Sequence, residues 1–290
     1  MTTAPTTFAP AGPTGSQAPA RRRTSTARDW VTMLRRNLLH ILRYPGLTVF
    51  VIGGPVLFLL LSVYVFGGTL GAGLPADVLA LTGGETGRAA YLAFVAPTIL
   101  VMAIAGAASG VAISVSMDVT RGIASRFRTM PVSRGSIIGG HVLAVTIEAV
   151  LTSALVLGLA LLMGYRPAAS PADWLALLGI VVLLSFAIVW LGAAFGLVAK
   201  SVETASNLPM ILILLPFLGS GFVPVDSMPG WLAWFAEHQP FTPFIDTVRG
   251  LLSGSVQTSD VVATLIWAVV IGVGSYVWAL ALFRKERAAA

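Results

Sequence analysis

The sequence predicts an all-α integral membrane protein with six transmembrane helices, an N-terminal interfacial amphipathic helix, and an extracellular re-entrant helical hairpin between spans five and six. Three observations predict this class. Of the 290 residues, 56% are hydrophobic and only 10% are charged, too few charges for the surface of a soluble domain. Several apolar runs have the length of about 20 residues that a helix needs to cross a bilayer. Basic residues gather in alternate loops.

The distribution of basic residues predicts the topology. Fifteen of the 18 Lys and Arg residues fall in the N-terminal region, in the 118–134 loop, at Lys200 and after Phe283, and the other three are Arg88, Arg166 and Arg249. Because cytoplasmic loops carry the excess of Lys and Arg, both termini of this multi-pass membrane protein are expected in the cytoplasm. The net charge of +6 is then a topology signal, and no nucleic-acid partner is expected.

The N-terminal region divides into two parts. Residues 1–27 are rich in Thr, Pro, Ala and Ser without an apolar period and predict a disordered cytoplasmic arm. Residues 28–44 have a helical apolar period but too many basic residues to span. Trp30 is expected to anchor this helix in the headgroup plane, with Arg35 and Arg36 reaching to the lipid surface. Pro45 and Gly46 then turn the chain into the bilayer.

The apolar runs predict the spans in order. They cover about 47–67, 91–116, 137–163, 174–198, 207–222 and 261–283, and residues 286–290 form a cytoplasmic tail. Small residues at 103–110 in the second span are expected to let another helix approach closely. The fifth span is short and contains Pro209 and Pro216.

The central loop, 117–135, is basic and lies between two long spans. Its apolar residues recur at helical intervals until Pro131, which predicts a short amphipathic helix held near the membrane. Such a helix is suited to fill a groove on a cytoplasmic partner. The alternative is a solvated loop that only fixes the topology.

The link between spans five and six mixes prolines with aromatic residues. This composition predicts a re-entrant hairpin at 223–254, covered by protein or water, in which Asp246 and Arg249 form a local pair. The alternative is an interfacial aromatic belt without a role in transport.

One carboxylate is expected inside the membrane. Glu148 is the twelfth residue of the third span, about 16 Å along the helix, and a charge at that depth is costly unless it is protonated, paired or hydrated. Glu148 therefore either lines a substrate path that favours cationic or amphipathic cargo, or joins helices as a protonated or hydrogen-bonded glutamate.

Catalytic motifs are missing from the sequence. Neither lysine stands in a P-loop, the three histidines are scattered, and there is no cysteine. No catalytic residue, metal ligand or cofactor site is therefore predicted, and the chain is not expected to be an enzyme.

Two segments resemble one protein family. GIASRFRTMPVSRGSIIGGHVLA (122–144) is similar to the cytoplasmic loop and third span of ABC-2 type transporter permeases, especially the daunorubicin-resistance type. GFVPVDSMPGWLAWFAEHQPFTPFIDTVRGLLSG (221–254) looks like the extracellular hairpin of the same family. The resemblance covers about 28–285.

The resemblance implies the transmembrane permease of an ATP-binding cassette exporter for hydrophobic or amphipathic drug-like molecules. It would pair with a second permease chain, a homodimer being favoured over a heterodimer, and with two copies of a nucleotide-binding subunit that binds ATP and Mg²⁺. The implied coupling residues in the central loop are Asp118, Arg121, Ile123, Arg126, Phe127, Arg128 and Met130. The implied outer gate includes Pro216, Phe222, Trp231 and Arg249.

Other functions stay open at this point. The same scaffold would suit the export of lipid or of a cell-envelope glycoconjugate. From a different class, a proton-coupled secondary transporter would use Glu148 as its proton carrier, but such proteins usually show paired halves, and no internal symmetry is seen. A membrane scaffold without transport is the remaining alternative.

Overall fold

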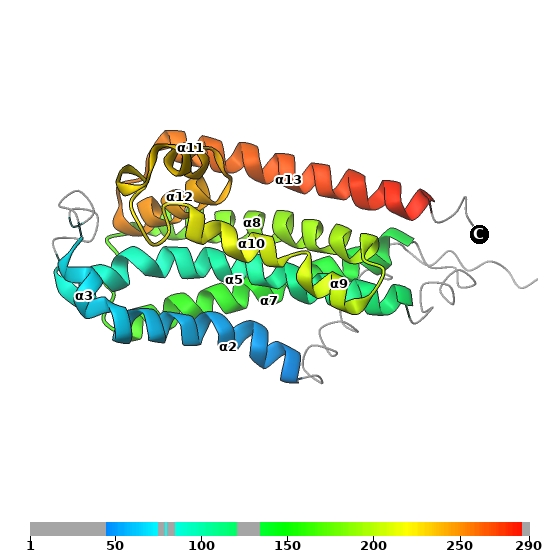
Figure 1. Cartoon of the computed structure of the whole chain (residues 1–290), viewed down its shortest axis with the longest axis horizontal. Coiled ribbons are helices and arrows are strands. Elements are labelled where there is room, and N and C mark those ends of the chain that lie inside the picture. Colours follow the sequence, from blue (N-terminus) through cyan, green and yellow to red (C-terminus); the bar gives the residue numbers. More distant parts are fainter. Residues whose placement is uncertain (1–44, 75–78, 80–84, 121–133, 286–290) are drawn as a thin grey trace, which may run out of the picture.

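Long apolar helices account for most of the residues that the structure describes. The computed structural model describes residues 45–74, 79, 85–120 and 134–285, which include five helices long and apolar enough to cross a membrane. The first is formed by α2 (Pro45–Leu61), a π-helical turn (Ser62–Phe66) and α3 (Gly67–Ala72). The others are α5 (Gly87–Thr120), α7 (Arg134–Leu162), α8 (Pro171–Val198) and α13 (Thr258–Lys285). The protein is thus an all-helical, multi-pass membrane protein (Figure 1).

These five helices overlap five of the six predicted spans. The second begins at Gly87, before its predicted start, and continues to Thr120. Residues 28–44, most of the central loop and 286–290 lie outside the described residues, so nothing is added to the predictions for them.

The predicted fifth span differs from a single helix. Within 207–222 the chain forms α10 (Met210–Leu214) and a 3₁₀ turn, η2 (Leu215–Leu218), and a further short helix, α9 (Val202–Asn207), comes just before them. Pro209 and Pro216 lack the amide hydrogen that a continuous helix uses, which accounts for the breaks. The run Val202–Leu218 is shorter than the five long helices. In Figure 1 it nevertheless extends along the bundle, from α9 toward α11 and α12.

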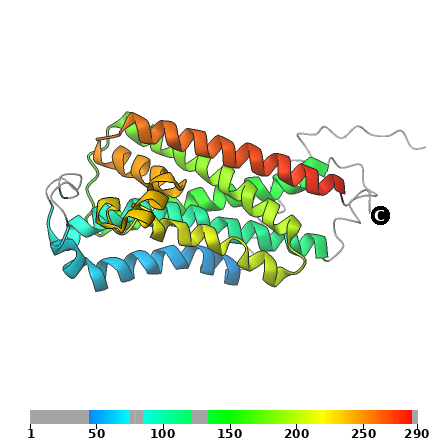
Figure 2. The ribbon, with the colours of Figure 1, turned by 45° about the horizontal axis from the view of Figure 1, so that its top comes forward.

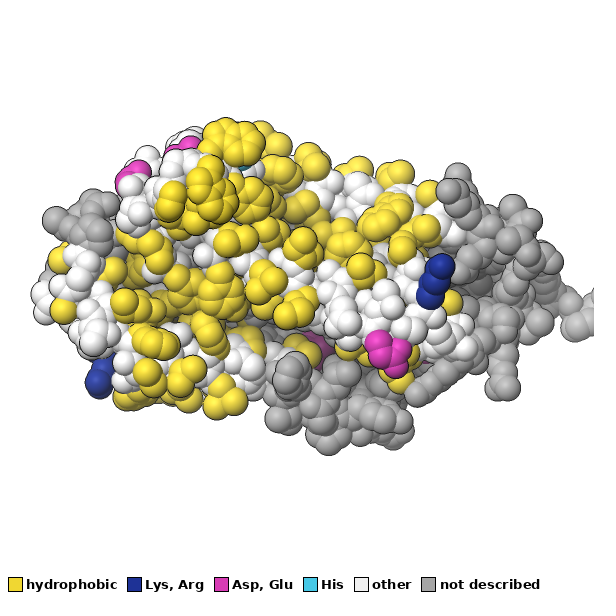
Figure 3. Space-filling model, viewed as in Figure 1, with side chains coloured by type: hydrophobic (Ala, Val, Ile, Leu, Met, Phe, Trp, Pro, Cys, Tyr) yellow, Lys and Arg dark blue, Asp and Glu magenta, His cyan; other side chains and the backbone are white. Residues whose placement is uncertain are grey.

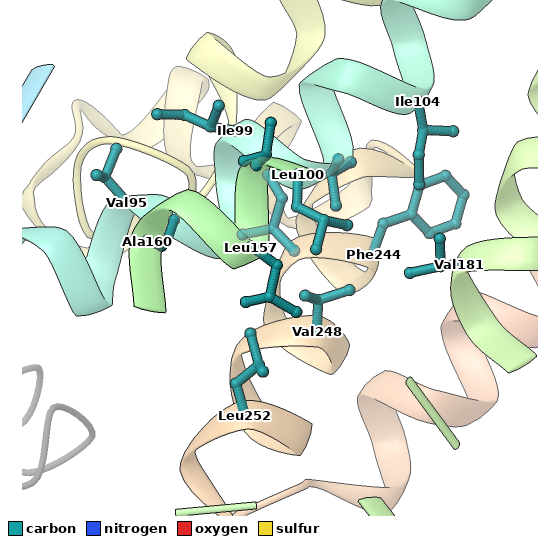
Figure 4. Close-up of a cluster of buried hydrophobic side chains, with 14 of the residues drawn as sticks. Val95, Ile99, Leu100, Ile104, Leu157, Ala160, Val181, Phe244, Val248 and Leu252 are labelled. Carbon is teal, nitrogen blue, oxygen red and sulfur yellow. The ribbon is translucent and has the colours of Figure 1, made fainter. Parts of the chain in front are cut away.

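Two short helices close one end of the bundle. They are α11 (Gly230–His238) and α12 (Phe241–Ser253), preceded by a 3₁₀ turn at Val225–Ser227. The apolar face of α12 is buried between the long helices, where it joins the largest hydrophobic core (Figure 4). That core combines Val95, Ile99, Leu100 and Ile104 of α5, Leu157 and Ala160 of α7, Val181 of α8, and Phe244, Val248 and Leu252 of α12. α12 is therefore part of the packed interior.

Small residues allow α5 and α8 to approach closely. A Cβ atom added to Gly192 would lie 2.5 Å from the carbonyl oxygen of Ala108, and one added to Gly196 would lie 2.6 Å from that of Ala112. Ala108 belongs to the small-residue run at 103–110, so the predicted close approach is confirmed and its partner is α8 of the same chain.

The outer surface is mostly apolar. Hydrophobic side chains cover most of the face in Figure 3, and Lys and Arg side chains appear there only toward the two ends. α5 is the most buried of the five long helices, whereas the first helix and α13 are mostly exposed. Exposed apolar helix faces of this kind suit contact with lipid or with another membrane chain.

Candidate transport site

The buried arginine of α12 organises the end of the bundle that α11 and α12 close. Asp246 and Arg249 are three residues apart, so both lie on one side of the helix, and the distance from Nη1 of Arg249 to Oδ1 of Asp246 is 2.6 Å. The local pair predicted from the sequence is confirmed. Nη2 of Arg249 also donates to the carbonyl oxygen of Ser220 at 2.9 Å, and the guanidinium carbon lies 4.4 Å from the centre of the Phe94 ring. One side chain thus links α12, the segment after η2, and α5.

Burial shapes the electrostatics of this cluster. Burial raises the pKa of Asp246, while Arg249 and the hydroxyl of Ser220, which donates to the carboxylate at 2.8 Å, lower it. Burial likewise lowers the pKa of Arg249, and Asp246 and Tyr165 oppose that shift. The pKa of Tyr165 rises to about 12, again through burial, with Arg249 opposing. Asp246 and Arg249 thus each oppose the pKa shift that burial causes in the other.

The segment 219–222 fits tightly beside α12. The hydroxyl of Thr98 on α5 donates to the carbonyl oxygen of Gly221 at 2.7 Å. A Cβ atom on Gly221 would meet the carbonyl oxygen of Pro216 at 2.6 Å, and one on Gly219 would meet the Gln239 amide nitrogen at 2.2 Å. A larger residue at Gly221 would therefore press on the backbone of Pro216, whereas one at Gly219 would displace the buried side chains of Gln239 and Thr242.

Three of the four predicted gate residues lie in or next to this packing. Pro216 is buried in η2, and Arg249 is at the centre of the cluster. Phe222 stacks on Phe217, with ring centres 4.7 Å apart, and meets Phe58 of α2 edge-on at 5.7 Å. Trp231 does not join them, because its side chain on α11 is 75% exposed.

The sequence alone does not predict several members of the cluster. Ser220, Phe94, Tyr165 and Thr98 contact or surround Arg249 and its neighbours but come from distant parts of the chain. The pattern Gly219-Ser220-Gly221 does indicate a close backbone approach, because glycine on both sides of a polar residue is typical of one. Phe94 and Thr98, within a long apolar run, gave no such signal.

Glu148 is buried in the middle part of α7. Its side chain is among the few buried charged groups, and Oε1 has no hydrogen-bond partner within the part of the chain that the structure describes. The hydroxyl of Thr152, one turn farther along α7, donates to the backbone carbonyl oxygen of Glu148 at 2.9 Å, and this bond does not involve the carboxylate. A buried acid with an unpaired oxygen is suited to accept a hydrogen bond from a ligand, a proton or a second chain.

A contact between α5 and α7 lies next to the central loop. Nε2 of His141 is 2.9 Å from Oδ2 of Asp118, which belongs to the last turns of α5. His141 lies seven residues before Glu148 on α7, and its partner is on the neighbouring helix. The remaining residues predicted for coupling and for the interfacial helix lie outside the described residues. They are Arg121, Ile123, Arg126, Phe127, Arg128, Met130, Trp30, Arg35 and Arg36.

A metal centre is not formed by the described residues, which contain no group of three or more His, Asp or Glu side chains placed to hold an ion.

Comparison with known proteins identifies relatives over most of the chain. The model of a family described as ABC-2 type transporter matches residues 28–253. The daunorubicin resistance ABC transporter permease protein of Streptomyces coeruleorubidus is 27% identical over 274 residues, covering 90% of this chain and 90% of the relative. A probable doxorubicin resistance ABC transporter permease protein of Mycobacterium tuberculosis is 26% identical over 173 residues, covering 60% of this chain and 63% of the relative.

Proposed function

The chain belongs to the ABC-2 type transporter family, and on that premise we propose that it exports hydrophobic or amphipathic drug-like molecules from the cell. As an ABC-2 permease it is a non-catalytic transmembrane subunit, and ATP is bound by a separate nucleotide-binding subunit. The observation that carries the export proposal is the match over 90% of both chains to a daunorubicin resistance permease.

The proposed complex contains two copies of this permease and two nucleotide-binding subunits. The proposed topology has six passes, with Val202–Leu218 as the fifth and both termini in the cytoplasm. Two features support it. The run α9, α10 and η2 extends along the bundle, and in both ribbon views α2 starts on the side of the molecule toward the end where α13 finishes (Figures 1 and 2). The basic residues concentrate in the segments next to that end.

Coupling to ATP hydrolysis is proposed to act through residues 118–134. Asp118 and Arg134 lie on α5 and α7, the helices that frame this segment. The contact between Asp118 and His141 joins those helices close to it. A push from the nucleotide-binding subunit on the segment would then be passed to two packed helices together.

The opposite end of the bundle is proposed to form the outer gate. Arg249 holds α12 to Ser220 and Phe94, so an exit path along α12 opens only when these contacts are exchanged for others. Glu148, buried with an unpaired oxygen, is proposed to line the path between the two ends and to favour cargo with a positive group. Trp231, which is exposed, is proposed to contact the bilayer or the second permease.

Vesicle transport tests the export proposal. The chain is coexpressed with a candidate nucleotide-binding subunit from the same genome, and inside-out membrane vesicles are assayed for uptake of doxorubicin by its fluorescence. We expect uptake that requires ATP and that disappears when the P-loop of the partner is inactivated, which serves as the matched control. Uptake driven by an imposed pH gradient without ATP would instead support a proton-coupled transporter and contradict the proposal.

A further inference from the structure

An apolar groove lies on the side of the bundle, and neither Glu148 nor Arg249 is among the residues that line it. It has a volume of about 480 Å³ and lies between the first half of α8, the end of α12 and the first half of α13. One wall is formed by Ala172, Ala176 and Gly179, and the other by Val261 and Leu265. The size is that of a small-molecule pocket.

The groove exists because the residues on one face of α8 have small side chains. Ala172, Ala176 and Gly179 recur at intervals of four and three residues and so share a side of the helix. Gly179 has no atom within 4 Å of the place where a Cβ would be, whereas Gly272 of α13, farther along the bundle, would bring a Cβ within 3.5 Å of Ala187 on α8. α8 and α13 therefore pack closely along part of their length and leave space at this end.

The residues next to the lining positions on α8 and α13 are apolar and exposed. Leu175 and Leu178 on α8 and Val262 and Ile266 on α13 are large, apolar and exposed, with between 47% and 73% of each side chain accessible. In a membrane protein such faces contact hydrocarbon. A ligand thus reaches the groove from the bilayer.

A single charged residue lines the groove. Asp173 stands in the first turn of α8, and Oδ2 of its carboxylate accepts hydrogen bonds from the amide and the hydroxyl of Ser170, at 2.8 and 2.7 Å. These bonds fix the carboxylate, and Oδ1 makes no hydrogen bond within the described part of the chain. The lining contains no Lys, Arg or His. A positive group at this end of the groove would be attracted and an anion repelled, so an occupant with an apolar body and a positive group fits the lining best.

We propose that the groove between α8, α12 and α13 binds a cationic amphiphile from the bilayer, with its apolar body between Ala176 and Leu265 and its positive group at Asp173. The proposal concerns binding by this chain alone and does not rest on the export function. It differs from the path proposed along Glu148, which lies on another helix.

Binding is measured on the full chain in phosphatidylcholine nanodiscs. The probes are two dansyl-labelled undecyl compounds, one ending in trimethylammonium and one in carboxylate, and empty nanodiscs give the background. We expect the cationic probe to bind at least about ten-fold more tightly than the anionic one. Equal binding of both probes would show a site for any alkyl chain and would overturn the proposal.

Two pairs of variants locate the site. Ala176→Trp fills the groove, whereas Leu178→Trp adds the same side chain on the exposed face of α8, so only the first is expected to abolish saturable binding of the cationic probe. Asp173→Asn keeps an acceptor oxygen for Ser170 but removes the charge. It is expected to weaken the binding of the cationic probe about ten-fold. Asp226→Asn removes an exposed acid outside the groove and should leave both probes unchanged.

Other outcomes contradict the proposal. Native affinity in Ala176→Trp would place the probe elsewhere. Equal loss of probe binding in Ala176→Trp and Leu178→Trp would indicate a general effect on the helix. Dissociation of a dimer by Ala176→Trp, without saturable probe binding in the native chain, would identify the groove as an interface between copies of the chain. Thermal unfolding of each variant in the same nanodiscs separates these results from misfolding.

Discussion

Nε2 of His141 on α7 lies 2.9 Å from Oδ2 of Asp118 on α5, so a single polar contact joins the two helices that lead into the central loop. Both side chains are mostly buried, with 12% and 19% of their surface exposed. We expect His141→Ala and Asp118→Ala to lower the free energy of unfolding, and the double variant to lose less than the sum, with a coupling energy of about 1 kcal/mol. Unfolding in mixed micelles measures the cycle. Strictly additive losses would mean that the contact contributes nothing.

The close packing of α8 on α5 predicts a second effect. A Cβ on Gly192 would lie 2.5 Å from the carbonyl oxygen and 2.7 Å from the Cα of Ala108, so the backbone must move to accommodate Gly192→Ala. We expect a loss of about 1–3 kcal/mol in the free energy of unfolding. Gly179→Ala on the same helix is the control, because nothing lies within 4 Å of its Cβ position. Similar stability of the two variants would contradict the close approach.

Replacing Arg249 is expected to lower the stability of the chain, and lysine at this position is not expected to restore it. Arg249→Met leaves Asp246 buried without its cation, and we expect a loss of about 3 kcal/mol in the free energy of unfolding. Arg249→Lys is expected to recover little of it, because one ammonium cannot contact Asp246 and Ser220 while lying flat over Phe94.

Arg166→Met is the matched control for Arg249→Met. Arg166 is exposed, lies after the end of α7, and donates to the carbonyl oxygens of Leu161 and Tyr165. Its removal should change the unfolding free energy by less than about 0.5 kcal/mol. Full stability of Arg249→Lys would show that only the charge of residue 249 matters.

Asp246 predicts a pH dependence of stability. Burial raises the pKa of its carboxyl in the folded chain above the ordinary 3.8, so the folded state binds the proton more tightly than the unfolded state does. This contribution to stability is fully present below pH 3.8 and is lost as the pH rises through the raised pKa. Arg249 keeps its contacts to Ser220 and Phe94 when Asp246 is neutral.

Asp246→Asn tests that dependence. The asparagine does not titrate, so the difference in unfolding temperature between the variant and the native chain should change with pH across this acidic range and be constant above it. Nanodisc samples scanned from acidic to neutral pH give the measurement, and Asp226→Asn, an exposed acid, is the control. The same difference at every pH would show that Asp246 does not cause the effect.

The sequence predicts the long helices well because hydrophobic runs of bilayer length have few other uses. It predicts the pair of Asp246 and Arg249 because both partners lie within one helical turn. The breaks in the predicted fifth span were signalled by Pro209 and Pro216, although the sequence alone did not show that the helix would divide into short pieces.

The sequence does not predict contacts that depend on how helices rotate and pack. Asp118 and His141 are 23 residues apart, and Phe94 and Arg249 are 155 apart, so each pairing follows from the bundle as a whole. The groove at Asp173 is a similar case. Small residues on α8 were visible, but whether another helix would fill the space beside them depended on the placement of α12 and α13.

Glu148 predicts selectivity for charge if it lines the proposed path. Glu148→Gln keeps the shape of the side chain, and the bond from Thr152 survives because it goes to the backbone of residue 148. We expect a rise of about ten-fold in the KM for doxorubicin, which carries a protonated amine, and little change for an uncharged cargo of similar size. Glu203→Gln, which alters an exposed acid on α9, is the control. Equal effects on both cargoes, together with a lower unfolding temperature, would instead identify Glu148 as a residue that joins helices, because a packing role does not distinguish the charge of the transported molecule.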